Sequence, residues 1–418
     1  MTIPSNAQPS GIGRTPAAFP RYMLDAVMER IARLVEESDG KHLLFFWSGR
    51  CLDYADRLWL EGEREPLIPT RQAAAMMLGP MEHYRRAHHL PRPDGTADDG
   101  DDADAPDIEW SVLSPTRDLP GVEDALSGFR KVVDNALHST DWTHAALNLS
   151  VCASALAAFT NCTDKDWLAL SDENDDLAGQ IRCYMENVAR YADSPTAGIA
   201  LGEIAKTVYE PDIQFYDPMN AAMLISSAAA FARHPDRVMW AYDVVDTAVE
   251  HFGETHDAEL PHEALLASRR VLRRYLLMVA YDVRRLAEDD EGCRKLWHDH
   301  PDHASLTLMR ALTLIERERY REAYDVVVGF VARRGSLREA DGLIARNGLL
   351  KGILTHGWSS IMECCLEGMG DAPRLAALYR SYIERHADHG DDESASLYED
   401  RLAALERWEA SRDEPRTC

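Results

Sequence analysis

The acidic stretch "LSDENDDLAGQ" (residues 170–180) is the first group in this sequence that could bind a metal ion. Asp172 and Asp176 are four residues apart, so on a helix they share one face, and Asp175 is adjacent. Carboxylates so placed can hold Mg²⁺ or Ca²⁺. The same residues are typical of a helix start, with Ser171 capping and the acids facing the positive end of the helix dipole. The helix start is the favoured interpretation, and a metal-dependent all-α enzyme is the alternative function.

A second candidate metal site lies in "CRKLWHDHPDH", which contains His298, His300 and His303 after Cys293. Thiolate and imidazole are the usual zinc ligands. The stretch has no Cys-x-x-Cys pair, and its polar, Pro-containing composition is typical of an exposed loop between helices. The loop is the favoured interpretation, so we expect no bound metal here.

A candidate nucleophile and base occur together in "LTHGWSSIMECCLEG", where His356 precedes Cys364 and Cys365. Their apolar helical setting indicates buried structural thiols instead. The other cysteines are also thinly spread among apolar residues, which predicts reduced thiols and a cytoplasmic protein. The sequence contains no phosphate-binding glycine loop, Gly-x-Ser-x-Gly or His-Glu-x-x-His motif, so we expect no cofactor.

The formal net charge of −26 argues against nucleic acid or an anionic membrane as the main partner. One basic cluster has helical spacing and is interpreted as a solvated helix face; it consists of Arg269, Arg270, Arg273 and Arg274. We find no apolar run that would span a membrane, and expect none as a partner.

The spacing of apolar residues predicts helices over most of the chain and no strand, which is an all-α fold. Thr70 is expected to cap one early helix, and Pro80 to kink or split it. The expected organisation is a flexible N-terminus (1–18), an N-terminal helical region (19–90), an acidic disordered linker (91–118), a helical-repeat domain (119–408) and a flexible tail (409–418).

Two stretches repeat one pattern, "AYDVVDTAVEHFG" from Ala241 and "AYDVVVGFVARRG" from Ala323. Each follows a helix and a break, near 234–236 and 316–319. Helix, turn and helix ending at glycine is the unit of an α-solenoid. The two units share one frame, in which Ala229 corresponds to Ala311, Ala241 to Ala323, Val245 to Val327 and Gly253 to Gly335.

These units resemble tetratricopeptide repeats, over about residues 220–386. The positions that match the family pattern are Ala229, Ala241, Val245 and Ala248 in one unit and Ala311, Tyr320, Ala323 and Val327 in the other. A further match runs from Leu366 through the turn at 370–371 to Tyr379. The chain departs from the family pattern: Ile225 and Thr307 replace its Trp, and the two units lie 82 residues apart (323 minus 241) where the family has roughly 34 per unit. A generic all-α domain with two similar hairpins remains the alternative fold.

The resemblance implies stacked antiparallel helical hairpins and a binding function. We expect a non-catalytic scaffold or adaptor for a protein or peptide partner, and an acidic surface favours a partner with basic segments. The predicted contact residues are Trp240, Tyr242, Tyr320 and Tyr324. Packing in the core is the alternative role for each of them.

Overall fold

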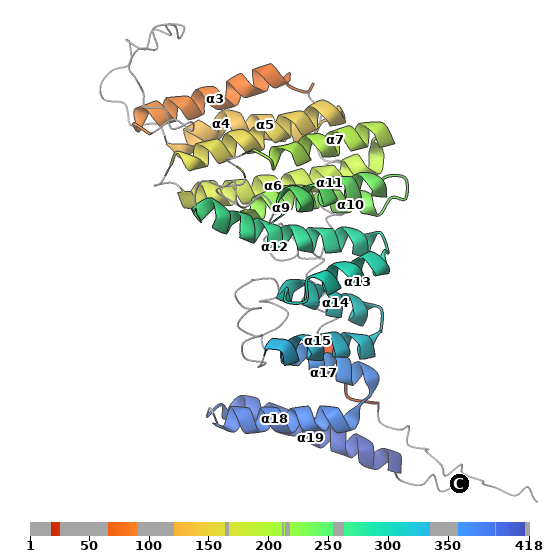
Figure 1. Ribbon diagram of the computed structural model, residues 1–418. Helices are drawn as coiled ribbons and strands as arrows, with labels where there is room; N and C mark the ends of the chain where they lie inside the picture. The colour runs from red at the N-terminus through yellow and green to blue at the C-terminus, as the bar shows by residue number, and fades with distance from the viewer. Residues whose placement is uncertain are drawn as a thin grey trace, which may run out of the picture. The chain divides into compact units, whose positions relative to one another are not determined.

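The computed structural model describes residues 18–25, 66–90, 121–163, 167–210, 213, 218–253, 263–334, 358–388 and 390–413. Within these ranges every regular element is a helix and no strand occurs (Figure 1). The prediction of an all-α fold is therefore confirmed. The expected acidic linker over 91–118 lies outside the described residues.

The chain forms two compact units, residues 32–310 (the central unit) and residues 1–31 with 311–418 (the terminal unit). The helices of the central unit are α3 (Thr70–Ala87), α4 (Val122–Leu137), α5 (Trp142–Asn161), α6 (Trp167–Tyr191), α7 (Ser194–Thr207), α9 (Pro218–Ser226), α10 (Ala228–Ala232), α11 (Val238–His251), α12 (Glu263–Leu286) and α13 (Asp290–Asp299). Helix α14 (Ala304–Glu316) contains the boundary. The terminal unit then has α15 (Tyr320–Arg334), α17 (Trp358–Met369), α18 (Ala372–Asp388) and α19 (Asp392–Asp413). Helix α19 thus continues past the boundary expected at residue 408.

Helices of the central unit pack on helices one to three places away in the chain; α7 packs mainly on α5, and α9 mainly on α12. Helix α4 contacts α3, α5 and α6, and α5 contacts α3, α4, α6 and α7. The pattern continues through α6, α7 and α9, and α12 packs on α9, α10, α11 and α13 (Figure 1). Breaks in the helical pattern that the sequence predicts near 234–236 and 316–319 are confirmed, since α11 and α15 begin directly after them.

Helix α5 is buried on most faces, as its composition predicts; Ala145, Leu149, Cys152 and Leu156 are fully buried. Among the described residues α5 alone has the length and mean hydropathy (1.2) that would span a membrane, and 56% of that stretch is buried within the protein. This differs from the prediction that no apolar run would span a membrane. Packing on four neighbouring helices accounts for its apolar character without a membrane.

Helix α3 differs from expectation at Thr70 and is not split at Pro80. Thr70 is the first helical residue and does not cap, because the N–H groups of Gln72 and Ala73 donate to the carbonyl of Pro69. Pro80 lies inside one continuous helix, so it does not split the element.

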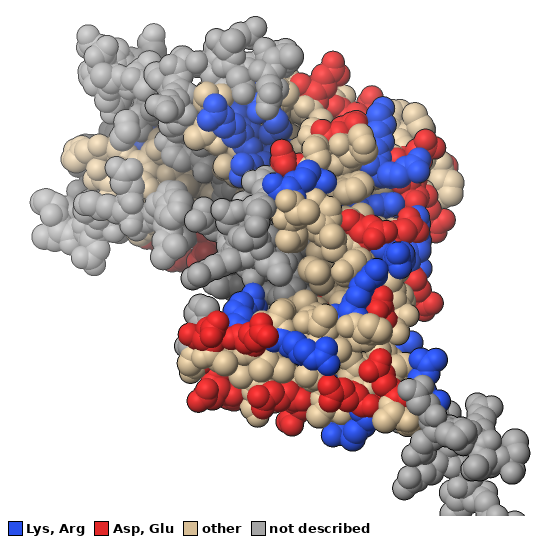
Figure 2. Space-filling model, turned by 60° about the horizontal axis from the view of Figure 1, so that its bottom comes forward, with Lys and Arg blue, Asp and Glu red and all other residues tan. Residues whose placement is uncertain are grey.

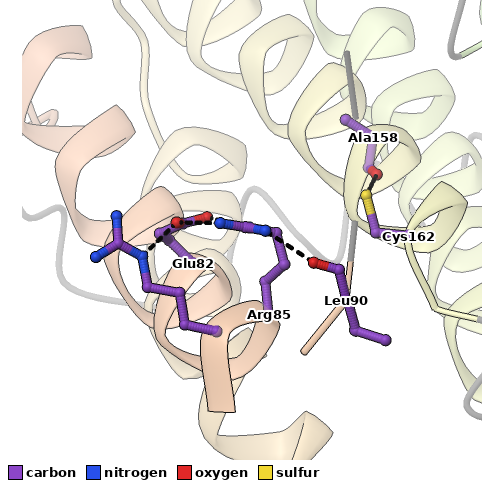
Figure 3. Close-up of polar contacts among 6 residues, drawn as sticks. Glu82, Arg85, Leu90, Ala158 and Cys162 are labelled. Carbon is purple, nitrogen blue, oxygen red and sulfur yellow. Dashed lines mark hydrogen bonds and ion pairs between the residues drawn. The ribbon is translucent and has the colours of Figure 1, made fainter. Parts of the chain in front are cut away.

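The C-terminal end of α3 is fixed by the nearly buried guanidinium of Arg85 (Figure 3). Arg85 donates from Nε and Nη2 to the two oxygens of Glu82, at 2.6 and 2.7 Å, and from Nη1 to the carbonyl of Leu90 at 2.8 Å. The hydrogen bonds that Glu82 accepts from Arg85, together with one from Arg86, lower the pKa of its carboxyl to about 2. This charged group therefore serves the fold and not a reaction.

One turn type connects helices at four places, between α12 and α13, α14 and α15, α17 and α18, and α18 and α19. In each, one residue adopts a left-handed conformation and the next N–H bonds back to the carbonyl five residues earlier, as from Arg319 to Leu314 (2.7 Å) and Asp371 to Leu366 (3.0 Å). The left-handed residues are Glu288, Glu318, Gly370 and Gly390, with φ of 59°, 57°, 65° and 69°. The next helix starts two residues after each of them. The recurrence indicates one connection geometry used repeatedly.

Exchanging residues at these turns tests how their backbone conformation affects stability. We expect Gly370→Ala to destabilise the terminal unit by about 1 kcal/mol, because a Cβ meets no atom within 4 Å there and only the left-handed backbone resists it. Glu318→Gly is expected to stabilise it by a similar amount. Urea unfolding followed by circular dichroism measures both changes, and a neutral Gly370→Ala would contradict the prediction.

Candidate functional site

Two buried carboxylates lie one helical turn apart on α17. Glu363 is 1% exposed and Glu367 is fully buried. They follow the apolar residues Ile361 and Leu366 into the interior instead of pointing to solvent. Buried carboxylates are rare unless they are paired or hydrogen-bonded, so each requires partners.

Glu363 is paired with Arg401 of α19. Arg401 Nη1 lies 2.6 Å from Glu363 Oε1, and the arginine side chain is only 16% exposed. Its guanidinium also lies 5.3 Å from the ring of Tyr398 and 5.1 Å from that of Tyr22. Burial raises the pKa of Glu363, and the charge of Arg401 opposes this. The arginine is therefore what keeps a buried anion tolerable at this position.

Glu367 binds the main chain of a segment 344 residues away. Its Oε2 accepts hydrogen bonds from the N–H of Met23 (2.8 Å) and of Leu24 (2.9 Å), and Oε1 accepts one from the Tyr379 hydroxyl (3.4 Å). Burial raises the pKa of Glu367 to about 7, although these N–H groups favour its charged form. The carboxylate does here what a capping side chain does at the start of a helix.

Residues 18–25, called the docked segment below, contact the same helices through their side chains. Phe19 meets the indole of Trp408 edge-on, with ring centroids 4.7 Å apart. Leu24 is 6% exposed, while Tyr22 keeps 43% of its surface in solvent under the Arg401 guanidinium. We call the parts of α17, α18 and α19 that hold the segment the docking face. The chain's own N–H, hydroxyl and guanidinium groups engage both buried acids of this face, while Oε2 of Glu363 has no hydrogen-bond partner among the described residues.

Two predicted contact residues, Tyr320 and Tyr324, belong to the terminal unit. The Tyr320 ring lies against α17 where Gly368 leaves room; a Cβ on Gly368 would come within 2.7 Å of Tyr320 Cδ2. Burial, then the charge of Glu318, raises the pKa of Tyr320, and the charge of Arg21 opposes this shift. Tyr324 is partly buried, with the guanidinium of Arg374 5.8 Å from its ring.

The other two predicted contacts, Trp240 and Tyr242, lie on α11 in the central unit. Trp240 is 44% exposed and rests on α7, where Gly198 leaves room for the indole. Tyr242 donates to Asp289 Oδ2 (3.4 Å), and its ring has Arg284 5.4 Å away. Burial, then the charge of Asp289, raises the pKa of Tyr242 to about 12. Tyr242 therefore stabilises the turn between α12 and α13, and Trp240 is the more accessible of the pair.

The candidate cation site on α6 does not have the expected helix start. Helix α6 begins at Trp167, so Ser171 lies inside it and is not an N-cap, and that interpretation is wrong. Asp172 and Asp176 are exposed on one face, and Asp175 is partly buried.

Asp176 lines an open pocket of about 400 Å³ with Glu173, Asp134 and the side chain of Arg130. Arg130 donates from Nε and Nη2 to Glu173, at 3.0 and 2.9 Å, and also binds Glu123. An arginine thus already supplies the positive charge that a metal ion would bring. Across the described ranges no three His, Cys, Asp or Glu side chains gather as a metal site.

The three histidines near α13 are separated by their environments. His298 is 83% exposed, and His300 caps the end of α13. His303 uses both ring nitrogens for the protein: Nδ1 accepts from the N–H of Leu306 (3.1 Å), and Nε2 donates to the carbonyl of Arg274 (3.2 Å). Burial lowers the pKa of His303 to about 4, so the ring is neutral at pH 7. His303 is a structural cap at the start of α14 and leaves no nitrogen for a metal.

The candidate thiols are buried. Burial raises the pKa of Cys364 and raises that of Cys365 to about 12, so neither is a ready nucleophile. Their proposed base, His356, lies outside the described residues. The cysteines that the structure describes are buried and form no disulfide; they are Cys152, Cys162, Cys183, Cys293, Cys364 and Cys365.

The arginine cluster on α12 only partly forms a solvated face. Arg269 is 8% exposed and lies 5.3 Å from the ring of Phe252. Arg273 donates from Nε to the carbonyl of Phe252 (2.8 Å), at the end of α11. Arg270 is exposed, and the carbonyl of Arg274 accepts from His303. The interpretation as a solvated face is therefore wrong for Arg269 and Arg273, which close a neighbouring helix.

The sequence interpretation did not include Glu363, Glu367, Arg401 and Trp408 among the functional residues. One signal was available, because "SIMECCLEGM" places two acids four residues apart within an otherwise apolar run.

Comparison with known proteins finds no matching family model, no similar curated protein and no similar solved structure.

Proposed function

We propose that this protein is a non-catalytic, tetratricopeptide-like scaffold that binds a segment of a protein partner. The packing of central-unit helices on helices one to three places away in the chain supports a stack of antiparallel helical hairpins. The recurring turn with one left-handed residue supports the same architecture, because a solenoid repeats one connection geometry. Buried free thiols support a reducing compartment such as the cytoplasm.

The observation that carries the proposal is the docked segment itself. Helices α17–α19 hold a stretch of polypeptide that lies far away in the sequence, through two main-chain hydrogen bonds and the aromatic contact of Phe19. Main-chain hydrogen bonds supplemented by side-chain contacts are the usual means by which domains recognise peptides. The helices of this protein therefore already have the chemistry that a peptide receptor needs.

The surface charge favours a partner with basic segments. Helices α18 and α19 expose many carboxylates, and Figure 2 shows acidic side chains in rows over these C-terminal helices, with fewer Lys and Arg among them. The exposed acids are Glu384, Asp388, Asp392, Glu393, Glu399, Asp400 and Glu406. Together with the net charge of −26, they would attract a basic partner and repel an acidic one.

Panning a phage-displayed peptide library on the full chain tests the scaffold. We expect saturable peptides enriched in Lys and Arg, whose affinity falls steeply with added salt. For peptides that bind the central unit, Trp240→Ala is expected to weaken binding about tenfold, as for other exposed tryptophans at interfaces. Leu78→Ala, which removes a side chain of 51% exposure from the same unit, is the control and should leave binding unchanged.

Two results would contradict this proposal. A library that yields no saturable binder would remove the binding function. A compact globular profile in small-angle scattering would remove the solenoid while leaving the all-α fold in place.

A further inference from the structure

The docked segment starts a helix that cannot cap itself. Helical residues begin at Tyr22, and the N–H of Asp25 donates to the carbonyl of Arg21 (3.3 Å), which makes Arg21 the N-cap residue. Capping requires a side chain that accepts hydrogen bonds, and an arginine has only donors. The N–H groups of Met23 and Leu24 would therefore lack a local partner.

Glu367 supplies the missing cap from another helix. One of its oxygens accepts from both N–H groups, at 2.8 and 2.9 Å, and the carboxylate is fully buried. Charge-assisted hydrogen bonds of this kind are stronger than neutral ones, and a buried carboxylate without them would be costly. The docking face and the uncapped helix start are thus chemically complementary.

Side chains around the contact between Glu367 and the two N–H groups further restrict which segment can bind the docking face. Phe19, two residues before the N-cap, contacts Trp408, and Tyr22 lies beneath the guanidinium of Arg401. Leu24 is buried at the third helical position. Together these contacts select an aromatic residue before the N-cap, an aromatic residue at the first helical position and an apolar residue at the third.

We propose that the docking face is a receptor for the uncapped first turn of a partner's helix, and that the docked segment is its built-in competitor. The inference rests on the scaffold function proposed above and names the partner chemistry. The partner segment carries an aromatic residue, then a basic residue in place of a capping one, then an aromatic and an apolar residue, as in "FPRYMLD" (residues 19–25). It displaces the docked segment because both need the same carboxylate.

A labelled synthetic peptide of residues 18–31 serves as the probe for this exchange. In the full-length variant Met23→Pro/Leu24→Ala the built-in segment loses one N–H donor and its buried side chain, while proline is tolerated in a first helical turn. We expect this variant to bind the peptide at least about tenfold more tightly than the wild-type chain does. Adding Glu367→Met to the variant should abolish the gain.

The matched control is the same peptide with Arg21→Asp. It caps its own helix and brings a second carboxylate towards Glu367, so it should bind at least about tenfold more weakly. Equal binding of the two peptides, or equal binding by variant and wild-type chains, would overturn the proposal.

A measurement on the unmodified chain guards against misfolded variants. With excess unlabelled peptide, the amides of Met23 and Leu24 in the protein should exchange hydrogen faster, while those of α18 stay protected. No change in these amides at saturating peptide would overturn the proposal. If no library peptide competes with residues 18–31, the proposal would also be overturned, while the scaffold function would stand.

Discussion

Replacing Arg401 with methionine is expected to destabilise the terminal unit by about 3–5 kcal/mol at pH 7.5, because it leaves the Glu363 carboxylate buried without its ion partner. Burial already raises the pKa of Glu363, and loss of the guanidinium raises it further. The folded unit then holds its proton at pH values where the unfolded chain, with a pKa near 4.5, has released it. The destabilisation is therefore largest above the folded pKa and fades as the pH falls towards 4.5.

Urea unfolding of the variant at pH 5 and pH 7.5 measures this effect. Arg380→Met on α18 is the matched control, since it breaks an ion pair with Glu406 (3.4 Å) whose side chains are 57% and 56% exposed. Exposed pairs contribute at most about 1 kcal/mol, so the control should change little at either pH. Glu363→Gln added to Arg401→Met should recover most of the loss. An Arg401→Met chain no less stable than Arg380→Met would show that Glu363 is not the charge being compensated.

The second large effect is expected in the central unit, where Gly128→Ala should cost about 3 kcal/mol or more. Gly128 lies in α4 directly against the main chain of α3. A Cβ there would overlap the carbonyl oxygen of Met76 and come within 2.9 Å of its carbonyl carbon. Because a helix main chain cannot move aside as a flexible side chain does, the cost lies at or above the upper end of ordinary overpacking.

Gly202→Ala on α7 is the control for that substitution, because a Cβ there meets no atom within 4 Å. It should stabilise the unit by about 1 kcal/mol through the better helix propensity of alanine. Chemical denaturation of both variants separates the two effects. Equal stabilisation by Gly128→Ala and Gly202→Ala would mean that α3 and α4 do not approach each other this closely.

How far the fold could be predicted depended on whether a signal was local. The period of apolar residues is local, so the helices α4, α5 and α11 and the breaks before α11 and α15 were all predictable. The first residues of helices were harder to predict from the sequence. Ser171 has good capping chemistry, yet α6 begins at Trp167, because apolar residues ahead of it, such as buried Leu170, extend the helix into the core.

The candidate site could not be predicted from the sequence, because the groups that form it lie far apart in the chain. Nothing near Glu367 in the sequence indicates that it binds N–H groups 344 residues away. Nothing in the sequence indicates that Arg21 occupies an N-cap position whose side chain cannot accept hydrogen bonds. His303 shows the same limit, because its role as a neutral cap depends on the carbonyl of Arg274 on another helix.

The separation between the docked segment and Glu367 also has a consequence for the order of events during synthesis. Chains grow at roughly 5–20 residues per second, so Met23 emerges roughly 20–70 s before the residue that caps it. Throughout that interval the N–H groups of Met23 and Leu24 have been synthesised, but the Glu367 carboxylate that accepts their hydrogen bonds has not. During synthesis, therefore, the docked segment is open to any other carboxylate before Glu367 can cap it.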